Sequence, residues 1–258
     1  EHEAGFFSCC SIRLQSIINY HNEHKRCPNI VDTKNMFTWY KNENNKDNDI
    51  TFEYFKHYNA DGMYKSIEYK SHNYYYEGLQ FSNYKNLNFD GILPFIKKYF
   101  SPSLDITYYV IEITKKYKIN FNNTAVLFYR GNDKATETKL SSYEEYIIQA
   151  HKILKEKPDI RFIIQSDETE FIEKMLNEFP SSIWFKDETR SIKRDSTSTV
   201  DFRLNSNNNM FSKYFLAIII IMSKCRYIVC GSGNCSIWMA FYRGNANGMI
   251  QYFNGEWL

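Results

Sequence analysis

Two basic and two acidic side chains stand in one short segment near the middle of the chain. They are Arg130, Asp133, Lys134 and Glu137. The apolar run Ala125–Tyr129 precedes them and predicts a buried strand, which a turn at Gly131 ends. Cations at the carboxyl end of a parallel strand can bind phosphate oxygens, and a carboxylate there can accept a proton. The same spacing also fits an ordinary strand-to-helix loop whose charges are solvated.

A second candidate for anion binding is a glycine-containing turn near the C-terminus. Its residues are Gly231, Ser232, Gly233 and Asn234. The turn follows the predicted strand Tyr227–Cys230 and precedes the predicted helix Cys235–Tyr242. Glycines permit a tight turn, and the start of a helix offers free N–H groups and the positive end of its dipole. The spacing matches neither a P-loop nor a hydrolase nucleophile elbow.

The elements that position these two turns alternate regularly after residue 121. The predicted strands are Ala125–Tyr129, Ile160–Gln165, Ser182–Phe185 and Tyr227–Cys230. The predicted helices are Tyr143–Lys155, Glu168–Glu178, Phe211–Ser223 and Cys235–Tyr242. Such alternation predicts an α/β fold with a parallel sheet and right-handed crossovers. Lys186 to Asn209 is polar and is expected to form a loop.

The first 120 residues give a less regular pattern. The expected elements are a helix over Ile12–Tyr20 capped by Ser11, a short strand over Pro28–Asp32, and helices over Gly91–Lys98 and Leu104–Tyr117. The stretch Thr51–Tyr84 is rich in Tyr, Phe and His. Two interpretations stay open for it: half-buried strands, or an aromatic surface that contacts a sugar.

Composition excludes several classes of protein. The 258 residues are 43% hydrophobic and 24% charged, which suits one medium domain or two small ones. A net charge of +2 without a basic stripe argues against nucleic-acid binding. The longest apolar run, Tyr214 to Met222, is too short to span a membrane. The six cysteines lack Cys-x-x-Cys spacing, and a soluble protein of the reducing cytoplasm is favoured over one of the Golgi lumen.

These motifs, in this order, resemble the GDP-fucose-dependent fucosyltransferases. The similarity is to the α-1,6-fucosyltransferases of the N-glycan core and their nodulation counterparts, and it extends from about residue 91 to about residue 242. Phe128–Lys134 resembles the family motif His-x-Arg-Arg-x-Asp-Lys, and Glu144–Tyr146 its Glu-Glu-Tyr. Arg161–Asp167 resembles its strand ending in Thr-Asp-Asp, and Tyr227–Asn234 its nucleotide-side strand and Ser-rich turn.

The resemblance implies a GT-B-like glycosyltransferase fold of two Rossmann-like lobes. Residues 1–120 would form a reduced acceptor-side lobe whose first strand is missing or truncated, and residues 121–258 the lobe that binds the nucleotide sugar. The implied activity is transfer of fucose from GDP-fucose to a glycan hydroxyl, with inversion and without a metal ion. The partners implied are the nucleotide sugar and the glycan acceptor, and no cofactor is implied besides the donor.

The resemblance also implies roles for individual residues. Arg130 would bind the β-phosphate, Asp133 would orient the Arg130 side chain, and Lys134 would be a second cation for the leaving diphosphate. Glu137 would be the catalytic base. Further donor-binding residues carried over from the family are Tyr146, Asp167, Gly231, Ser232, Gly233 and Asn234.

Three departures from the family pattern bear on the donor. Phe128 and Gly131 stand where the family has His and its second Arg, and Ile218 stands where an Asp recognises guanine. Two alternatives therefore stay open beside GDP-fucose transfer. One is a different nucleotide sugar on the same scaffold, and the other is a glycosyltransferase-like protein that binds nucleotide or carbohydrate without catalysis. The acceptor-binding residues and the oligomeric state are not specified by the sequence.

Overall fold

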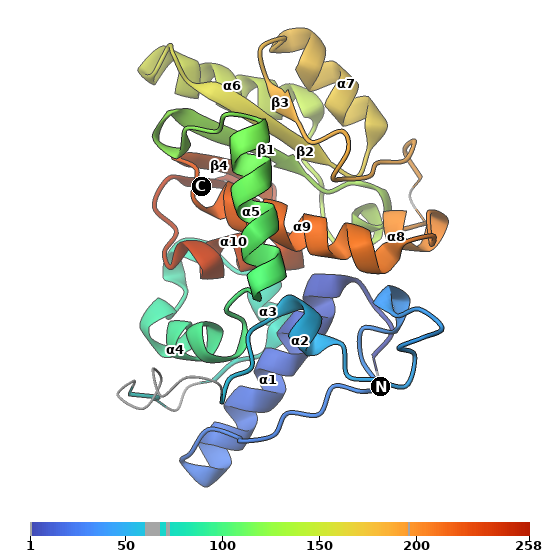
Figure 1. The fold of residues 1–258 in the computed structure, drawn as a ribbon. Coiled ribbons are helices and arrows are strands. Elements are labelled where there is room, and N and C mark those ends of the chain that lie inside the picture. The colour runs from blue at the N-terminus through green and yellow to red at the C-terminus, as the bar shows by residue number, and fades with distance from the viewer. Residues whose placement is uncertain (1, 60–67, 71–72, 196) are drawn as a thin grey trace.

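The chain folds around one mostly parallel β-sheet. The computed structural model describes residues 2–59, 68–70, 73–195 and 197–258 (Figure 1). The strands of the sheet are β1 Thr124–Tyr129, β2 Arg161–Ser166, β3 Ile183–Trp184, β4 Tyr227–Gly231, β5 Met249–Phe253 and β6 Glu256–Trp257. Their order is β3-β2-β1-β4-β5-β6, with the first five parallel and β6 antiparallel at one edge. The predicted α/β class is confirmed.

The strand order creates a switch point between β1 and β4. From β1 the chain moves outward through β2 to β3, and then returns to place β4 on the other side of β1. Phe128 in β1 lies opposite Gln165 in β2 and Cys230 in β4. Crossovers that leave in opposite directions open a crevice at the carboxyl ends of the strands, where ligands of open α/β sheets bind. Both turns singled out in the sequence end strands at this crevice.

Alternating residues of β1 face two different layers of helices. Ala125, Leu127 and Tyr129 pack against α6 Tyr143–Glu156 and α7 Thr169–Glu178. Val126 and Phe128 face the second layer, formed by α5 Leu104–Lys116, α9 Asn208–Ser223 and α10 Asn234–Arg243. Because both faces are covered, the strand is a continuous apolar run, as buried parallel strands are.

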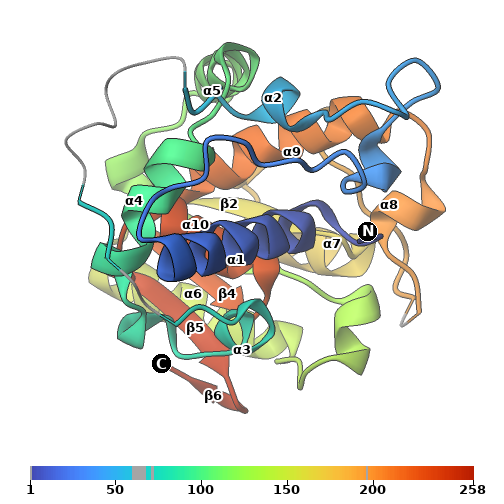
Figure 2. The ribbon, with the colours of Figure 1, turned by 90° about the horizontal axis from the view of Figure 1, so that it is seen from below.

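The N-terminal part of the chain is helical and packs on the second layer. Its α-helices are α1 Phe6–His24, α2 Thr51–Tyr54, α3 Tyr76–Gln80 and α4 Phe89–Tyr99. Figure 2 shows α1 running past α10, which it contacts. One hydrophobic core contains residues from both parts of the chain: Phe6 and Tyr99 lie in the same cluster as Ile218 and Trp238. The helices predicted near α4 and α5 are confirmed.

The strand predicted over Pro28–Asp32 is wrong. Its backbone groups bond to side chains instead of a neighbouring strand: the Pro28 carbonyl accepts from the Tyr99 hydroxyl at 2.7 Å, and the Val31 N–H donates to the Tyr58 hydroxyl at 2.8 Å. Ile30 is 83% exposed, while Val31 packs partly buried against the hydrophobic core. Before Thr124 the described residues form isolated bridges but no strand. The second Rossmann-like lobe that the resemblance implies is therefore not found in that part of the chain.

Other boundaries differ from the predictions as well. Helix α1 begins at Phe6 after Gly5, so Ser11 is not its N-cap; the Ser11 hydroxyl is buried and donates to Asn234 Oδ1 at 2.9 Å. The stretch Thr51–Tyr84 forms the short helices α2 and α3 where it is described, not strands. The predicted loop after Lys186 contains α8 Val200–Arg203. Strands β5 and β6 were not predicted.

Two further properties concern the chain as a whole. In the described ranges, no helix combines the length and the apolar character needed to cross a membrane. All six cysteines have free thiols.

Candidate functional site

A cavity of about 670 Å³ lies at the switch point of the sheet. The carboxyl ends of β1, β2 and β4 form one side of it, through Arg130, Gln165 and Ser232. The start of α1 and the segment around Tyr40 form another side, and α8 and α9 contribute Asp201 and several aromatic rings. The size is in the range of small-molecule binding sites. The cavity is therefore the candidate functional site of the protein.

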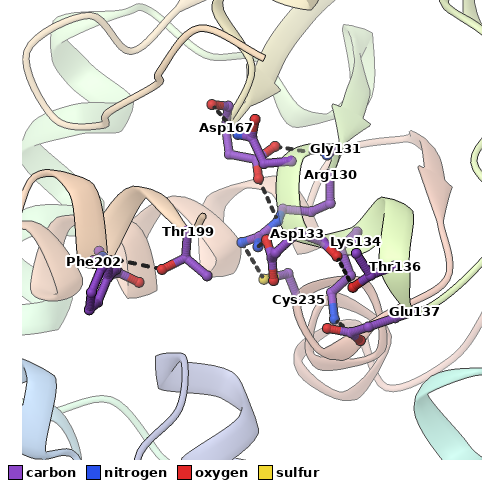
Figure 3. Close-up of polar contacts among 12 residues, drawn as sticks. Arg130, Gly131, Asp133, Lys134, Thr136, Glu137, Asp167, Thr199, Phe202 and Cys235 are labelled. Carbon is purple, nitrogen blue, oxygen red and sulfur yellow. Dashed lines mark hydrogen bonds and ion pairs between the residues drawn. The ribbon is translucent and has the colours of Figure 1, made fainter. Parts of the chain in front are cut away.

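Arg130 is the central cation of the cavity (Figure 3). Its guanidinium pairs with Asp133 at 3.2 Å and with Asp167 at 3.1 Å. Burial on its own would lower the pKa of this guanidinium, but Asp167, Cys235 and Asp133 more than compensate and raise the pKa above its ordinary value. The charge is thus permanent, and two carboxylates fix its position. A guanidinium held in this way can present its remaining N–H groups to a phosphate.

Lys134 brings the two sequence motifs together. It lies on the short 3-10 helix Asn132–Thr136, and its side chain is 12% exposed and forms an ion pair with Glu137. Its Cε is 3.7 Å from the position that a Cβ on Gly233 would occupy, so it reaches the glycine turn after β4. A second cation therefore lies beside the start of α10.

The start of α10 is open towards the cavity. Gly233 is its N-cap, and among the described residues no side chain caps the helix and no acid stands in its first turn. Gly233 has φ of 153°, which a residue with a side chain rarely adopts. Its N–H donates to the Tyr84 hydroxyl at 3.0 Å, which holds the turn in place. The N–H groups that begin a helix and the positive end of its dipole attract anions.

The structure places the predicted site residues in two groups. Those that line the cavity are Arg130, Asp133, Lys134, Glu137, Asp167, Ser232, Gly233 and Asn234. Tyr146 and Gly231 lie outside the lining. Tyr146 is fully buried and its hydroxyl donates to the Phe128 carbonyl at 2.8 Å, so it supports the end of β1 from the helix layer below. Ile218 is also fully buried and lies outside the lining. Its position is therefore not available for recognition of a nucleotide base in the cavity.

Asp167 organises the end of β1 as well as Arg130. Its Oδ1 accepts the Gly131 N–H at 2.9 Å, while Oδ2 faces the guanidinium. Asn132 adds a bond from its side-chain amide to the Asp167 carbonyl at 3.0 Å. The ends of β1 and β2 are thus tied together around the cation.

Several cavity residues were not predicted from the sequence. Asp201 on α8 accepts a hydrogen bond from the Tyr40 hydroxyl at 2.8 Å. Gln165 is 3% exposed, and its Oε1 has no hydrogen-bond partner among the described residues. A buried polar atom without a partner at a cavity wall is a group that a ligand can satisfy. The aromatic members of the lining are Phe6, Phe7, Trp39, Tyr40, Tyr76, Phe81, Phe128, Phe211 and Phe215.

A sequence signal for α8 does exist. Thr199 precedes the helix as its N-cap, and its side chain accepts the Phe202 N–H at 3.2 Å. A Thr followed by an acid in the next turn is typical of a helix start. This signal would have placed Asp201 in a helix, although not in the cavity.

Gly131 leaves room for a buried carboxylate, and replacing it by alanine is expected to destabilise the fold. A Cβ at this position would lie 1.9 Å from Glu168 Oε1. Glu168 cannot move freely, because it accepts the Asn132 N–H at 2.8 Å and a hydrogen bond from Tyr143. We expect Gly131→Ala to lower the free energy of unfolding by about 1–3 kcal/mol, the usual cost of overpacking. The midpoint of denaturant unfolding measures it.

Gly5→Ala is the matched control for this prediction. A Cβ on Gly5 meets nothing within 4 Å in the described part of the chain. If both substitutions change stability equally, the contact with Glu168 is not what requires glycine at residue 131.

The chain is similar in structure to proteins among the solved structures. No protein-family model and no curated protein matches the sequence. In the described ranges, no group of three or more His, Cys, Asp or Glu residues is placed to hold a metal ion. The crystal structure of NodZ alpha-1,6-fucosyltransferase soaked with GDP-fucose matches with 7% sequence identity and a TM-score of 0.42. The match covers 67% of this chain and 53% of that enzyme, so the chain spans about half its length. At this identity the similarity concerns the α/β fold alone.

Proposed function

We propose that the protein is a glycosyltransferase that binds a nucleoside diphosphate sugar in the cavity at the switch point. The observation that carries this proposal is the convergence of two cations, Arg130 and Lys134, with the open start of α10. A diphosphate is the common biological group that needs several N–H donors and two positive charges in a small volume.

The reaction has two electrostatic requirements. The leaving diphosphate gains negative charge, and the acceptor hydroxyl loses its proton. Arg130 and Lys134 meet the first requirement because they lie where that charge develops, and Asp133 and Asp167 keep the guanidinium in position. For the second requirement the sequence predicts Glu137, which lines the cavity and is paired with Lys134.

The proposed donor is GDP-fucose and the proposed acceptor a glycan hydroxyl, with inversion and without a metal ion. The sequence motifs around Arg130 and after β4 support this choice. The N-terminal residues that line the cavity, among them Trp39, Tyr76 and Glu77, are the place for the acceptor. Aromatic rings and acids suit a sugar because its apolar face stacks on the rings and its hydroxyls donate to carboxylates.

A thermal-shift panel of GDP, UDP, dTDP and CMP, with and without EDTA, tests the proposal. A ligand that binds only the native state raises the melting temperature, and more so as its concentration exceeds its Kd. Stabilisation by GDP that is indifferent to EDTA is the expected result. A shift with UDP or dTDP instead would keep the glycosyltransferase and replace the donor. An unchanged melting temperature with all four nucleotides would contradict the proposal.

A protein that binds nucleotide without catalysis is the second candidate. This candidate is favoured by Phe128 and Gly131, which stand where the fucosyltransferase motif has His and its second Arg. Release of GDP from GDP-fucose separates the two candidates. The enzyme releases GDP faster than the uncatalysed reaction, whereas the binding protein takes up GDP-fucose and returns it unchanged.

A further inference from the structure

Asp201 occupies a constrained position on the wall of the cavity formed by α8. Its Oδ2 accepts from the Tyr40 hydroxyl at 2.8 Å, and the Tyr40 oxygen in turn accepts the Phe6 N–H, the first of α1, at 2.7 Å. The Asp201 carbonyl accepts from the Asn208 side chain at 3.0 Å. The Tyr40 hydroxyl therefore holds the carboxylate directly, while Asn208 of α9 holds the backbone of α8 that carries it.

The carboxylate lies near the proposed diphosphate site. In Figure 3, Thr199 at the start of α8 is on one side of Arg130, and Lys134 and Glu137 are on the other. Asp201 is close enough to Arg130 for each to affect the ionisation of the other. A sugar whose diphosphate rests on the two cations would have its reactive carbon in the space between them and α8.

Burial shifts the pKa of the Asp201 carboxyl in the direction that suits a catalytic base. Removal from solvent raises the pKa of this carboxyl above its ordinary value, and the Tyr40 hydrogen bond only partly opposes this effect. The charged and titratable groups that face it from the surrounding elements are Tyr40, Tyr54, Arg130, Asp133, Arg190 and Cys235. A catalytic base works best when its pKa is shifted towards the working pH, so the shift is in the useful direction.

Glu137 has a different environment. Its side chain is 38% exposed, and its carboxylate is already paired with the Lys134 ammonium. The ion pair holds the Glu137 carboxylate beside the cation that is proposed to stabilise the diphosphate. This arrangement suits a residue that positions Lys134.

We propose that Asp201, rather than Glu137, accepts the proton of the acceptor hydroxyl; this inference rests on the proposed function. The acceptor O–H bond breaks and its proton goes to Asp201, while the oxygen bonds to the anomeric carbon of the donor. The bond from that carbon to the phosphate oxygen breaks, and its electron pair leaves with the nucleoside diphosphate. Arg130 and Lys134 bind the charge that appears there. Tyr40 is a positioning residue that aims the carboxylate.

The test compares two amide substitutions, Asp201→Asn and Glu137→Gln, in the full chain. GDP affinity is measured by calorimetry, and turnover as GDP released from GDP-fucose, with water or a mixture of released N-glycans as acceptor. We expect Asp201→Asn to change GDP affinity less than threefold and to slow turnover about 10²–10⁴-fold, the range for loss of general base catalysis. Glu137→Gln is expected to slow turnover less than tenfold.

Asp195→Asn is the matched control. Asp195 precedes the same helix, lies outside the cavity lining and pairs with Arg203 at 3.0 Å. Its substitution is expected to leave affinity and turnover unchanged.

The pH profile separates a base from a structural residue. A base must be deprotonated, so wild-type turnover should rise with pH through the raised pKa of Asp201, and this limb should vanish in Asp201→Asn. Tyr40→Phe removes a hydrogen bond that stabilises the carboxylate and should move the limb to higher pH. This second variant keeps the proposal testable if Asp201→Asn does not fold.

Each outcome decides one of the two proposals. Wild-type turnover in Asp201→Asn overturns the assignment of Asp201 while the proposed function stands. GDP binding without turnover in the wild type favours the non-catalytic binding protein, so the proposed catalysis and the role of Asp201 fail together while nucleotide binding stands. A larger loss in Glu137→Gln than in Asp201→Asn returns the role to Glu137. If the wild type does not bind GDP, the proposed function itself fails and this inference fails with it.

Discussion

Replacing Arg130 by lysine is expected to weaken GDP binding by about 10–150-fold, which corresponds to the 1.5–3 kcal/mol of a hydrogen bond to a charged group. The guanidinium contacts Asp133 and Asp167 together and still has N–H groups for a phosphate. A lysine ammonium is a compact charge with three donors and cannot serve two carboxylates and a phosphate with the same geometry. Calorimetric titration of GDP measures the effect.

Lysine is chosen because it keeps a charge between the two acids. A neutral side chain would leave the buried Asp167 carboxylate and the half-buried Asp133 carboxylate without this cation. Loss of the partner of a buried charge costs about 3–5 kcal/mol of stability, which would confuse an effect on binding with one on folding. Arg203→Lys is the control, since Arg203 is exposed at the end of α8 and lies outside the cavity lining. Equal GDP affinity in Arg130→Lys and the wild type would mean that this arginine does not bind the diphosphate.

Trp238→Ala is expected to have the largest effect on stability, about 3–5 kcal/mol, as for other buried aromatic residues. The ring is fully buried, and its centroid lies 4.8 Å from that of Phe100 and 5.9 Å from that of Phe7. Its N–H donates to the Ser11 hydroxyl at 2.8 Å. The substitution therefore removes contacts between α10 and the N-terminal part, and denaturant unfolding measures the loss.

The same experiment bears on the division at residue 120. Because one core joins the two parts of the chain, we expect a single unfolding transition whose midpoint falls in Trp238→Ala. Tyr108→Ala serves as control: that ring is 60% exposed on α5, so its removal should change stability by less than about 0.5 kcal/mol. Two separate transitions in the wild type would instead describe two lobes that are stable independently.

The sequence predicts the second half of the fold well because its signals are local. Strand β1 is a continuous run of buried residues that ends at Tyr129, two residues before Gly131, and α6 begins with a Ser142–Glu145 capping box. Signals of this kind depend on a few neighbouring residues, so they need no knowledge of the tertiary fold. They are sufficient to place the turns after β1 and β4 at one edge of a parallel sheet.

The features that were missed depend on distant contacts. Pro28–Asp32 is held by the hydroxyls of Tyr58 and Tyr99 instead of a neighbouring strand, and its local composition does not reveal that no strand pairs with it. Asp201 and Tyr40 are 161 residues apart, and no local pattern links them. Burial, which gives the Asp201 carboxyl its raised pKa, is likewise a property of the folded chain.

The central claim is that the cavity binds a nucleoside diphosphate through its β-phosphate. The most direct test is a pair of calorimetric titrations, of GDP and of GMP, into the wild-type protein. GMP lacks the group proposed to rest between Arg130, Lys134 and the start of α10, so we expect GDP to bind at least tenfold more tightly. Equal affinity for the two nucleotides, or no binding of GDP, would contradict the claim.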